Sequence, residues 1–252
     1  MKRTALSLCC VFVLAVTAIA QKLPNKQEKS VWAPADIKID GITTEWQNQF
    51  QAYNKATDLF YTVSNDDKNL YLIVQATIHD VIDKLLRGGI TFAVSSDKSD
   101  KNSISITYPF LEGHDVYAVA GGYTVKYVDY KDSKKAEANA TDVKAVNDII
   151  STTVKLMKVT GVESFTEPNI SVYNETGIKV AAHFDSKLAY TYELAIPLSY
   201  LKLTDKGVFN YHIKVNELPE PTSAVAYPPP VPATAMGTTD FWGQYTLAKK
   251  LK

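Results

Sequence analysis

The sequence has only two cysteines, Cys9 and Cys10, and both lie at the start of the chain. Residues 1–20 have the three parts of a secretory signal peptide: a charged Met1-Lys2-Arg3 start, an apolar run, and Ala18-Ile19-Ala20 as a small-residue cleavage pattern. Cleavage near Ala20 leaves a mature chain without thiols, which excludes disulfides, a cysteine nucleophile and thiolate metal ligands. We expect a secreted or periplasmic protein with no transmembrane segment after cleavage.

An excess of charge of either sign is also missing, because 27 basic side chains balance 27 acidic ones. This balance gives no indication of nucleic acid or of an anionic membrane surface as a partner. The GxSxG, HExxH, P-loop and GxGxxG patterns are absent, and we expect a protein that is not an enzyme. A glycosidase carboxylate pair stays open, since its members need only be neighbours in space. Glu193 lies in an alternating strand and is interpreted as a solvent-facing or hydrogen-bonded structural residue.

The chain does have many short alternating segments typical of β-strands. The clearest is Asp58–Ile78, where strands Leu59–Ser64 and Leu70–Ile78 flank a polar Asn/Asp turn and predict a hairpin. Along the second strand one face is fully apolar and needs a second layer to cover it. Further strands are expected at Ile90–Val94, Ile104–Phe110, Tyr123–Val128, Ile170–Tyr173, Ile178–Phe184, Tyr190–Ile196, Phe209–Val215 and Asp240–Leu247.

Two segments have helical spacing of apolar residues: His79–Arg87, and Thr141–Lys158, whose second half is open to an extended reading. Asn174–Gly177 predicts the turn of a second hairpin. The fold class is therefore predicted as all-β, an antiparallel β-sandwich with immunoglobulin-like or jelly-roll-like layering and one or two short helices. The expected organisation is a signal peptide at 1–20, a flexible lead-in at 21–35 and one domain at 36–252.

Several motifs resemble carbohydrate-binding module family 9 and the wider DOMON-like sandwiches. They are Ile39-Asp40-Gly41, Glu45-Trp46, DLFYTV at 58–63, NLYL at 69–72 and YELAIPL at 192–198. The resemblance covers most of Ile37–Leu203, without a motif between Ser95 and Lys158, and extends to secreted proteins of Bacteroidetes-type bacteria. It implies a sandwich that holds a sugar end between two tryptophans and carries structural calcium.

The candidate ligand-binding residues are aromatic or amide side chains: Trp242, Tyr227, Gln244 and Trp32. Stacking on a sugar needs a flat, exposed aromatic beside hydrogen-bonding groups, and Trp242 with nearby Gln244 offers both; the alternative is that Trp242 is a core residue of the last strand. Tyr227 precedes three prolines in the extended loop Leu218–Gly237. Trp46 is expected to pack within its motif.

Calcium is a candidate cofactor, because Asp97, Asp100 and Asn102 place three oxygen ligands in one loop. A second loop, Asn65-Asp66-Asp67, offers three more, although both are also ordinary turn sequences. Haem is a further alternative, with no pair of axial ligands at diagnostic spacing among the candidates His79, His114, His183, His212, Met157 and Met236.

These observations predict a secreted, non-catalytic binding protein that recognises a carbohydrate, as an oligosaccharide end, through an exposed aromatic platform. The alternative is a periplasmic or cell-envelope structural module that binds an envelope protein through the proline loop and an open sheet edge. An exposed aromatic lined with Asn, Gln or Asp favours the first hypothesis. A fully buried Trp242 with an apolar patch around Tyr227 favours the second.

Overall fold

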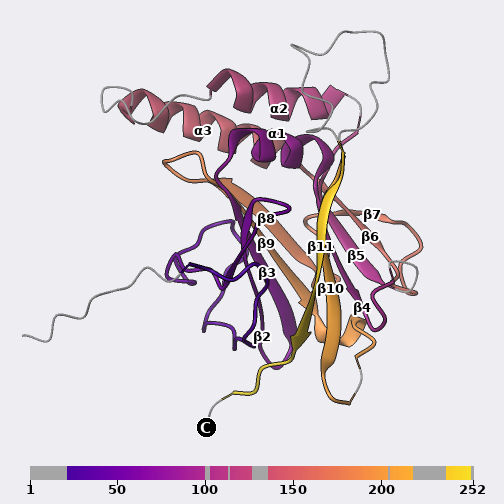
Figure 1. The fold of residues 1–252 in the computed structure, drawn as a ribbon. Helices are drawn as coiled ribbons and strands as arrows, with labels where there is room; N and C mark the ends of the chain where they lie inside the picture. The colour runs from indigo at the N-terminus through magenta and orange to yellow at the C-terminus, as the bar shows by residue number, and fades with distance from the viewer. Residues whose placement is uncertain are drawn as a thin grey trace, which may run out of the picture.

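The computed structural model describes residues 22–99, 103–112, 114–126, 136–203, 205–217 and 237–250. Within these residues, eleven strands form two antiparallel sheets that pack face to face (Figure 1). Sheet A has the order β1-β2-β3-β9-β8, and sheet B has the order β11-β10-β4-β5-β6-β7. The antiparallel β-sandwich predicted from the sequence is confirmed.

The elements have the following bounds. Sheet A contains β1 (Ala52–Asn54), β2 (Leu59–Asn65), β3 (Asn69–Ala76), β8 (Lys179–Phe184) and β9 (Tyr190–Pro197). Sheet B contains β4 (Ile90–Ser95), β5 (Ile104–Phe110), β6 (Leu156–Thr160), β7 (Asn169–Ser171), β10 (Val208–Val215) and β11 (Thr239–Thr246). The helices are α1 (His79–Gly88), α2 (His114–Lys126), α3 (Ala136–Thr153) and the short 3-10 helix η3 (Leu198–Tyr200).

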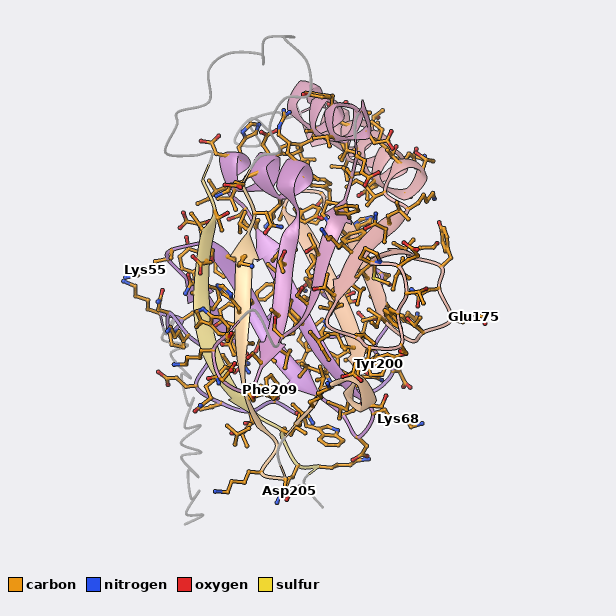
Figure 2. The ribbon with its side chains drawn as sticks, turned by 90° about the vertical axis from the view of Figure 1, so that its right-hand side faces the viewer. Lys55, Lys68, Glu175, Tyr200, Asp205 and Phe209 are labelled. Atoms are coloured by element: carbon orange, nitrogen blue, oxygen red, sulfur yellow. The ribbon has the colours of Figure 1, made fainter. Side chains whose placement is uncertain are left out.

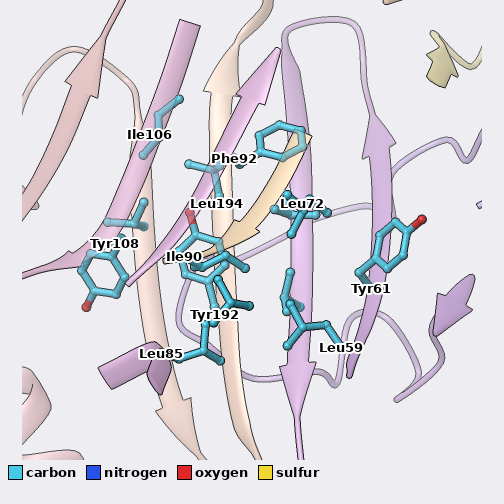
Figure 3. Close-up of a cluster of buried hydrophobic side chains, with 14 of the residues drawn as sticks. Leu59, Tyr61, Leu72, Leu85, Ile90, Phe92, Ile106, Tyr108, Tyr192 and Leu194 are labelled. Atoms are coloured by element: carbon cyan, nitrogen blue, oxygen red, sulfur yellow. The ribbon is translucent and has the colours of Figure 1, made fainter. Parts of the chain in front are cut away.

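The core fills the space between the two sheets. The predicted hairpin is present, with Asn65 opposite Leu70, and alternate residues of β3 from Leu70 to Ala76 are buried as expected. Figure 3 shows how side chains of sheet A, such as Leu72 and Leu194, meet Phe92 and Ile106 of sheet B in one apolar layer. Period-two alternation thus gives each sheet one apolar face, and the two faces cover each other.

The three α-helices lie together across one end of the sandwich, where the sequence indicated one or two (Figure 1). The strand predicted at Tyr123–Val128 is wrong, because Tyr123 lies in α2. Four buried residues of α2 recur at helical spacing and face the sandwich: Val116, Val119, Ala120 and Tyr123. The Tyr123 ring stacks on Phe184 at 5.1 Å between centroids. Tertiary packing therefore makes this segment helical although it contains Gly121 and Gly122, which are poor helix formers.

The second predicted hairpin is also wrong, since its two strands belong to different sheets. β7 pairs with β6 in sheet B, whereas β8 pairs with β9 in sheet A. Asn174 does form the expected turn, donating to the carbonyls of Ser171 and Ile178. The local turn chemistry is satisfied, but it connects the layers rather than two neighbouring strands. The extended reading of the segment after α3 is confirmed, because β6 begins at Leu156.

The segment expected to be a flexible lead-in makes specific contacts from Pro24 onward, whose carbonyl accepts from the Tyr53 N–H at 3.0 Å. Gln27 is buried, and its side-chain amide bonds both the N–H and the carbonyl of Val63 on β2, at 2.7 and 2.8 Å. The Gln27 backbone N–H also donates to the Tyr61 hydroxyl. An amide side chain paired with a strand in this way holds the segment against sheet A.

Candidate functional site

The outer face of sheet A is covered by the chain itself. The segment from Ala33 to Phe50 lies over β3 and β9, with buried Trp46 at its centre. Trp46 packs with Ala33, Tyr71, Ile73 and Ala195. The expectation that Trp46 packs within its motif is confirmed, and its burial removes it from the candidates for a ligand-stacking residue.

Glu193 on β9 anchors this covering segment. Its side chain is 1 % exposed and accepts hydrogen bonds from the backbone N–H groups of Asp40 and Gly41 and from the Trp46 indole N–H, at 3.0, 2.9 and 2.8 Å. Burial raises the pKa of Glu193 to about 7, against the lowering effect of the three N–H donors. Of the two roles that the sequence left open for Glu193, solvent-facing or hydrogen-bonded structural residue, the structure shows the second. The IDG, EW and YELAIPL motifs meet at its carboxylate.

The outer face of sheet B is different, because several of its strands place polar side chains there. In β10 the core residues alternate with Asn210, His212 and Lys214. Register places Trp242 opposite His212, and Gln244 opposite Asn210. The structure therefore brings Trp242 and Gln244, two of the predicted ligand residues, onto one face of an edge strand. Figure 2 looks onto this side, with β11 and β10 below the helices.

The Trp242 indole stacks on the imidazole of His212, on the neighbouring strand β10. The indole and the His212 imidazole lie 4.2 Å apart between centroids, with 18° between their planes. The His212 Nε2–H donates to Asp240 Oδ2 at 2.5 Å. Trp242 is half-buried, while Asp240 and Gln244 on either side of it are exposed. We call Asp240, Trp242 and Gln244, with His212 beside them, the β11 platform.

A close contact beneath the platform fixes its position. A Cβ atom on Gly243 would lie 2.0 Å from Tyr211 Cζ, so only glycine allows β11 to cross the Tyr211 ring here. The Tyr211 hydroxyl reaches the Tyr61 hydroxyl of sheet A at 2.9 Å, inside the core. Tyr211 thus packs beneath the platform and links sheet B to sheet A through its hydroxyl group. No motif in the sequence indicated that His212 or Tyr211 would contact Trp242 or Gly243.

Towards the centre of the sheet, the polar residues are buried. Asn210 is 7 % exposed; its amide donates to the Ser96 carbonyl at 3.0 Å, and its Oδ1 atom finds no hydrogen-bond partner in the described part of the chain. Thr91 bonds Thr107 at 2.7 Å and Asn216 at 3.1 Å. The accessible part of the site is therefore the edge along β11 rather than the middle of the sheet.

The other predicted ligand residues do not join the platform. Trp32 makes a bridge to Asn65 at the end of β2, and no ring contact with Trp242 is found among the described residues. Val31 beside it is bound to the Tyr245 hydroxyl, which places this segment near the end of β11. Tyr227 lies outside the described residues.

The predicted calcium ligands are only partly described. Asp97 accepts from the Ser95 hydroxyl at 2.7 Å and from the Ser99 N–H at 3.0 Å, whereas Asp100 and Asn102 lie outside the described residues. In the second loop, Asp66 accepts from two backbone N–H groups and from the Tyr71 hydroxyl, which is the role of a turn cap. Across the described part of the chain, no three His, Cys, Asp or Glu residues are grouped as metal ligands.

The haem-ligand candidates are dispersed in the part of the chain that the structure describes. His79 stacks on Tyr123, His183 bonds Asn147 of α3, and Met157 is fully buried in the core. His212 belongs to the platform, whereas the His114 side chain and Met236 lie outside the described residues. No described helix is long and apolar enough to cross a membrane.

Comparison with known proteins gives one solved structure of interest. No family model matches the sequence, and no curated protein matches it. A carbohydrate-binding module of family 9 from Caldicellulosiruptor kristjanssonii, solved in complex with glucose, aligns over 88 % of this chain and 97 % of its own, with 10 % identity and a TM-score of 0.41. This likeness is too distant to establish a family or a function.

Proposed function

We propose that the protein is a secreted, non-catalytic binding protein that recognises a carbohydrate at the β11 platform. The observation that carries the proposal is the half-buried Trp242, stacked on His212 and flanked on the same edge strand by exposed Asp240 and Gln244. A partly exposed aromatic with exposed hydrogen-bonding side chains beside it supports sugar binding over a protein-interaction module.

The chemistry of the platform suits a sugar ring. A pyranose has apolar C–H faces, which pack on an aromatic face, and a rim of hydroxyl groups, which need donors and acceptors. Asp240 accepts hydrogen bonds, and Gln244 both donates and accepts them. Since the stack with His212 already fixes the indole, little side-chain freedom is lost when a ligand binds.

The stack also defines where the ligand lies. His212 covers one face of the indole, so the ligand contacts the opposite face, which is turned away from β10 towards the outer edge of sheet B. A ring bound there has Asp240 on one side and Gln244 on the other. This geometry fits one sugar unit at a chain end better than a long chain laid across the sheet.

The test is calorimetric titration of the protein with neutral sugars chosen from a glycan array. Replacing Trp242 with Ala removes the stacking surface, and we expect a loss of about 2 kcal/mol, roughly thirtyfold in affinity. Gln244→Ala should weaken binding less. The matched control is Tyr173→Ala, because Tyr173 is an aromatic residue, 74 % exposed, that lies outside the platform.

Unchanged affinity in Trp242→Ala would refute the platform as the site. No binding of any sugar by a folded protein would remove the carbohydrate proposal and favour the alternative, a module that binds an envelope protein.

A further inference from the structure

A second candidate site lies on the outer face of sheet A, opposite the β11 platform. Phe50 lines two cavities there, one of about 510 Å³ and one of about 460 Å³. Thr43, Asn48, Gln75, Asp185 and Lys187 also line the first, and Leu23, Lys29 and Gln51 are among those that line the second. Each volume lies within the usual range for small-molecule sites, about 300 to 1,000 Å³. We call the two cavities together the Phe50 groove.

The first cavity is lined by polar atoms that have unused hydrogen-bonding capacity within the described part of the chain. Asn48 Oδ1 accepts from the Thr43 hydroxyl and Gln75 Nε2 donates to Thr191 at 3.1 Å, which leaves Asn48 Nδ2 and Gln75 Oε1 without a partner among the described residues. One Asp185 oxygen accepts from the N–H groups of Lys187 and Ala189, at 2.8 and 2.9 Å. Its second oxygen and the Lys187 ammonium have no hydrogen-bond partner within the described ranges.

The wall formed by residues 41–50 is held in place by the Glu193 anchor. Two backbone N–H groups and the Trp46 indole bind that carboxylate, and the Asn48 N–H donates to the Thr43 carbonyl at 3.0 Å. Gln47 and Asn48 both have positive φ, 55° and 54°, a conformation that non-glycine residues adopt only when their surroundings hold them. The cavity is therefore preformed, which lowers the cost of binding.

Aromatic side chains support the middle of the groove. The Phe50 ring lies 5.9 Å from Phe60, which in turn lies 4.6 Å from Tyr53, between centroids. Phe50 is half-buried, so part of its ring faces the groove. An aromatic ring between two cavities offers an apolar contact to the junction of two linked units.

These groups define the class of ligand. Donors and acceptors are mixed, and acids and bases nearly balance: Asp185 and Lys187 line the first cavity, and Glu28, Lys22 and Lys29 line the second. We propose that the Phe50 groove binds a neutral, hydroxyl-rich ligand of at least two units, of the oligosaccharide class, independently of the β11 platform. The two sites face away from each other on opposite sides of the sandwich. The proposal does not rest on the proposed function, because it uses none of the platform residues.

The experiment is titration calorimetry with neutral disaccharides to hexasaccharides of glucose, xylose, mannose and galactose. It compares the unaltered protein with Trp242→Ala, Gln75→Met and Lys187→Ala. Gln75→Met keeps the size of the side chain and removes its free acceptor, but it also removes the hydrogen bond to buried Thr191, so its thermal melt must match that of the unaltered protein. Lys187 is exposed, so Lys187→Ala leaves the core unchanged. Tyr173→Ala is the control, and thermal melting verifies that each variant is folded.

We expect binding that persists in Trp242→Ala and weakens at least tenfold in Gln75→Met. Lengthening the ligand from one unit to two should strengthen this binding. Binding that Trp242→Ala abolishes completely, or that Gln75→Met leaves unchanged, would overturn the proposal, as would the absence of any binding. If Gln75→Met loses sugar binding and Trp242→Ala does not, the result supports the Phe50 groove and refutes the β11 platform. The two hypotheses can therefore be refuted independently.

Discussion

The carboxyl group of Glu193 should make the stability of the protein fall as the pH rises. Its pKa is about 7 in the folded protein, against an ordinary value of 4.5, because it is buried on sheet A beneath Trp46. Below pH 4.5 the group is protonated in both the folded and the unfolded chain. Between 4.5 and 7 only the folded protein keeps the proton, and above 7 the folded protein holds a buried charge. The stabilising contribution is therefore complete at low pH and is lost as the pH rises through 7.

The magnitude follows from the difference between the two pKa values. At about 1.4 kcal/mol for each tenfold step in proton affinity, the free energy of unfolding should fall by about 3 kcal/mol between pH 4.5 and 8. Glu193 is 1 % exposed, so screening by solvent does not reduce this effect appreciably. Glu193→Gln removes the titration. Because its amide group cannot accept from all three N–H donors, the variant should be less stable than the unaltered protein at pH 4.5, by about 1 to 3 kcal/mol.

The assay is urea unfolding at half-unit pH steps, followed by tryptophan fluorescence, in the unaltered protein and in Glu193→Gln. We expect the gap in unfolding free energy between them to narrow as the pH rises. His183 has its pKa lowered by burial and loses its contribution as the pH falls, but this effect is shared by both proteins. A gap that stays constant from pH 4.5 to 8 would refute the reasoning, and would mean that the three N–H donors keep the carboxylate ionised throughout.

Two further predictions concern packing. Gly243→Ala should lower the free energy of unfolding by about 3 kcal/mol or more, because its Cβ would lie 2.0 Å from Tyr211 Cζ. The matched control is Gly121→Ala in α2, where a Cβ meets nothing within 4 Å, and it should raise the free energy of unfolding by about 0.5 to 1 kcal/mol. Equal effects of the two changes in thermal melts would contradict the contact with Tyr211. Gln27→Ala should cost about 1 to 3 kcal/mol in urea unfolding, because two buried hydrogen bonds to Val63 and a partly buried one to Lys29 are lost. An unchanged free energy of unfolding would contradict a stabilising role for these bonds.

The sequence predicts the strands well where one face is apolar and the other polar. The hairpin of β2 and β3, and strands β9, β10 and β11, follow from period-two alternation that the core enforces. α2 could not be found in this way, because its buried stripe is set by Tyr123 packing on Phe184, a contact between distant segments. The Asn174 turn was recognisable, but the sheets that its flanking strands join depend on partners elsewhere in the chain.

For the site, alternation along one strand is enough to place Trp242 and Gln244 on the same face. It cannot find His212, because the register between β10 and β11 pairs two strands that are separated by more than twenty residues. The Glu193 anchor is hidden for the same reason, since its donors lie about 150 residues earlier in the chain. The motifs of the first segment and YELAIPL resemble one family, yet only the folded chain shows that they form one hydrogen-bonded cluster.

An acid and a tryptophan lie at the outer face of each sheet, Trp46 coming from the segment that covers sheet A, and burial gives the two pairs different roles. Glu193 beside Trp46 is fully buried and accepts three N–H bonds, so little acceptor capacity remains for a ligand. The Asp240 side chain beside Trp242 is 44 % exposed and has His212 as its hydrogen-bond partner. A carboxylate has about four acceptor positions, so Asp240 keeps most of its capacity for hydroxyl groups. An acid beside a tryptophan thus holds the covering segment in place at Glu193 and Trp46, where both side chains are buried. At Asp240 and Trp242, on the edge strand β11, the same combination is partly exposed and forms a candidate binding site.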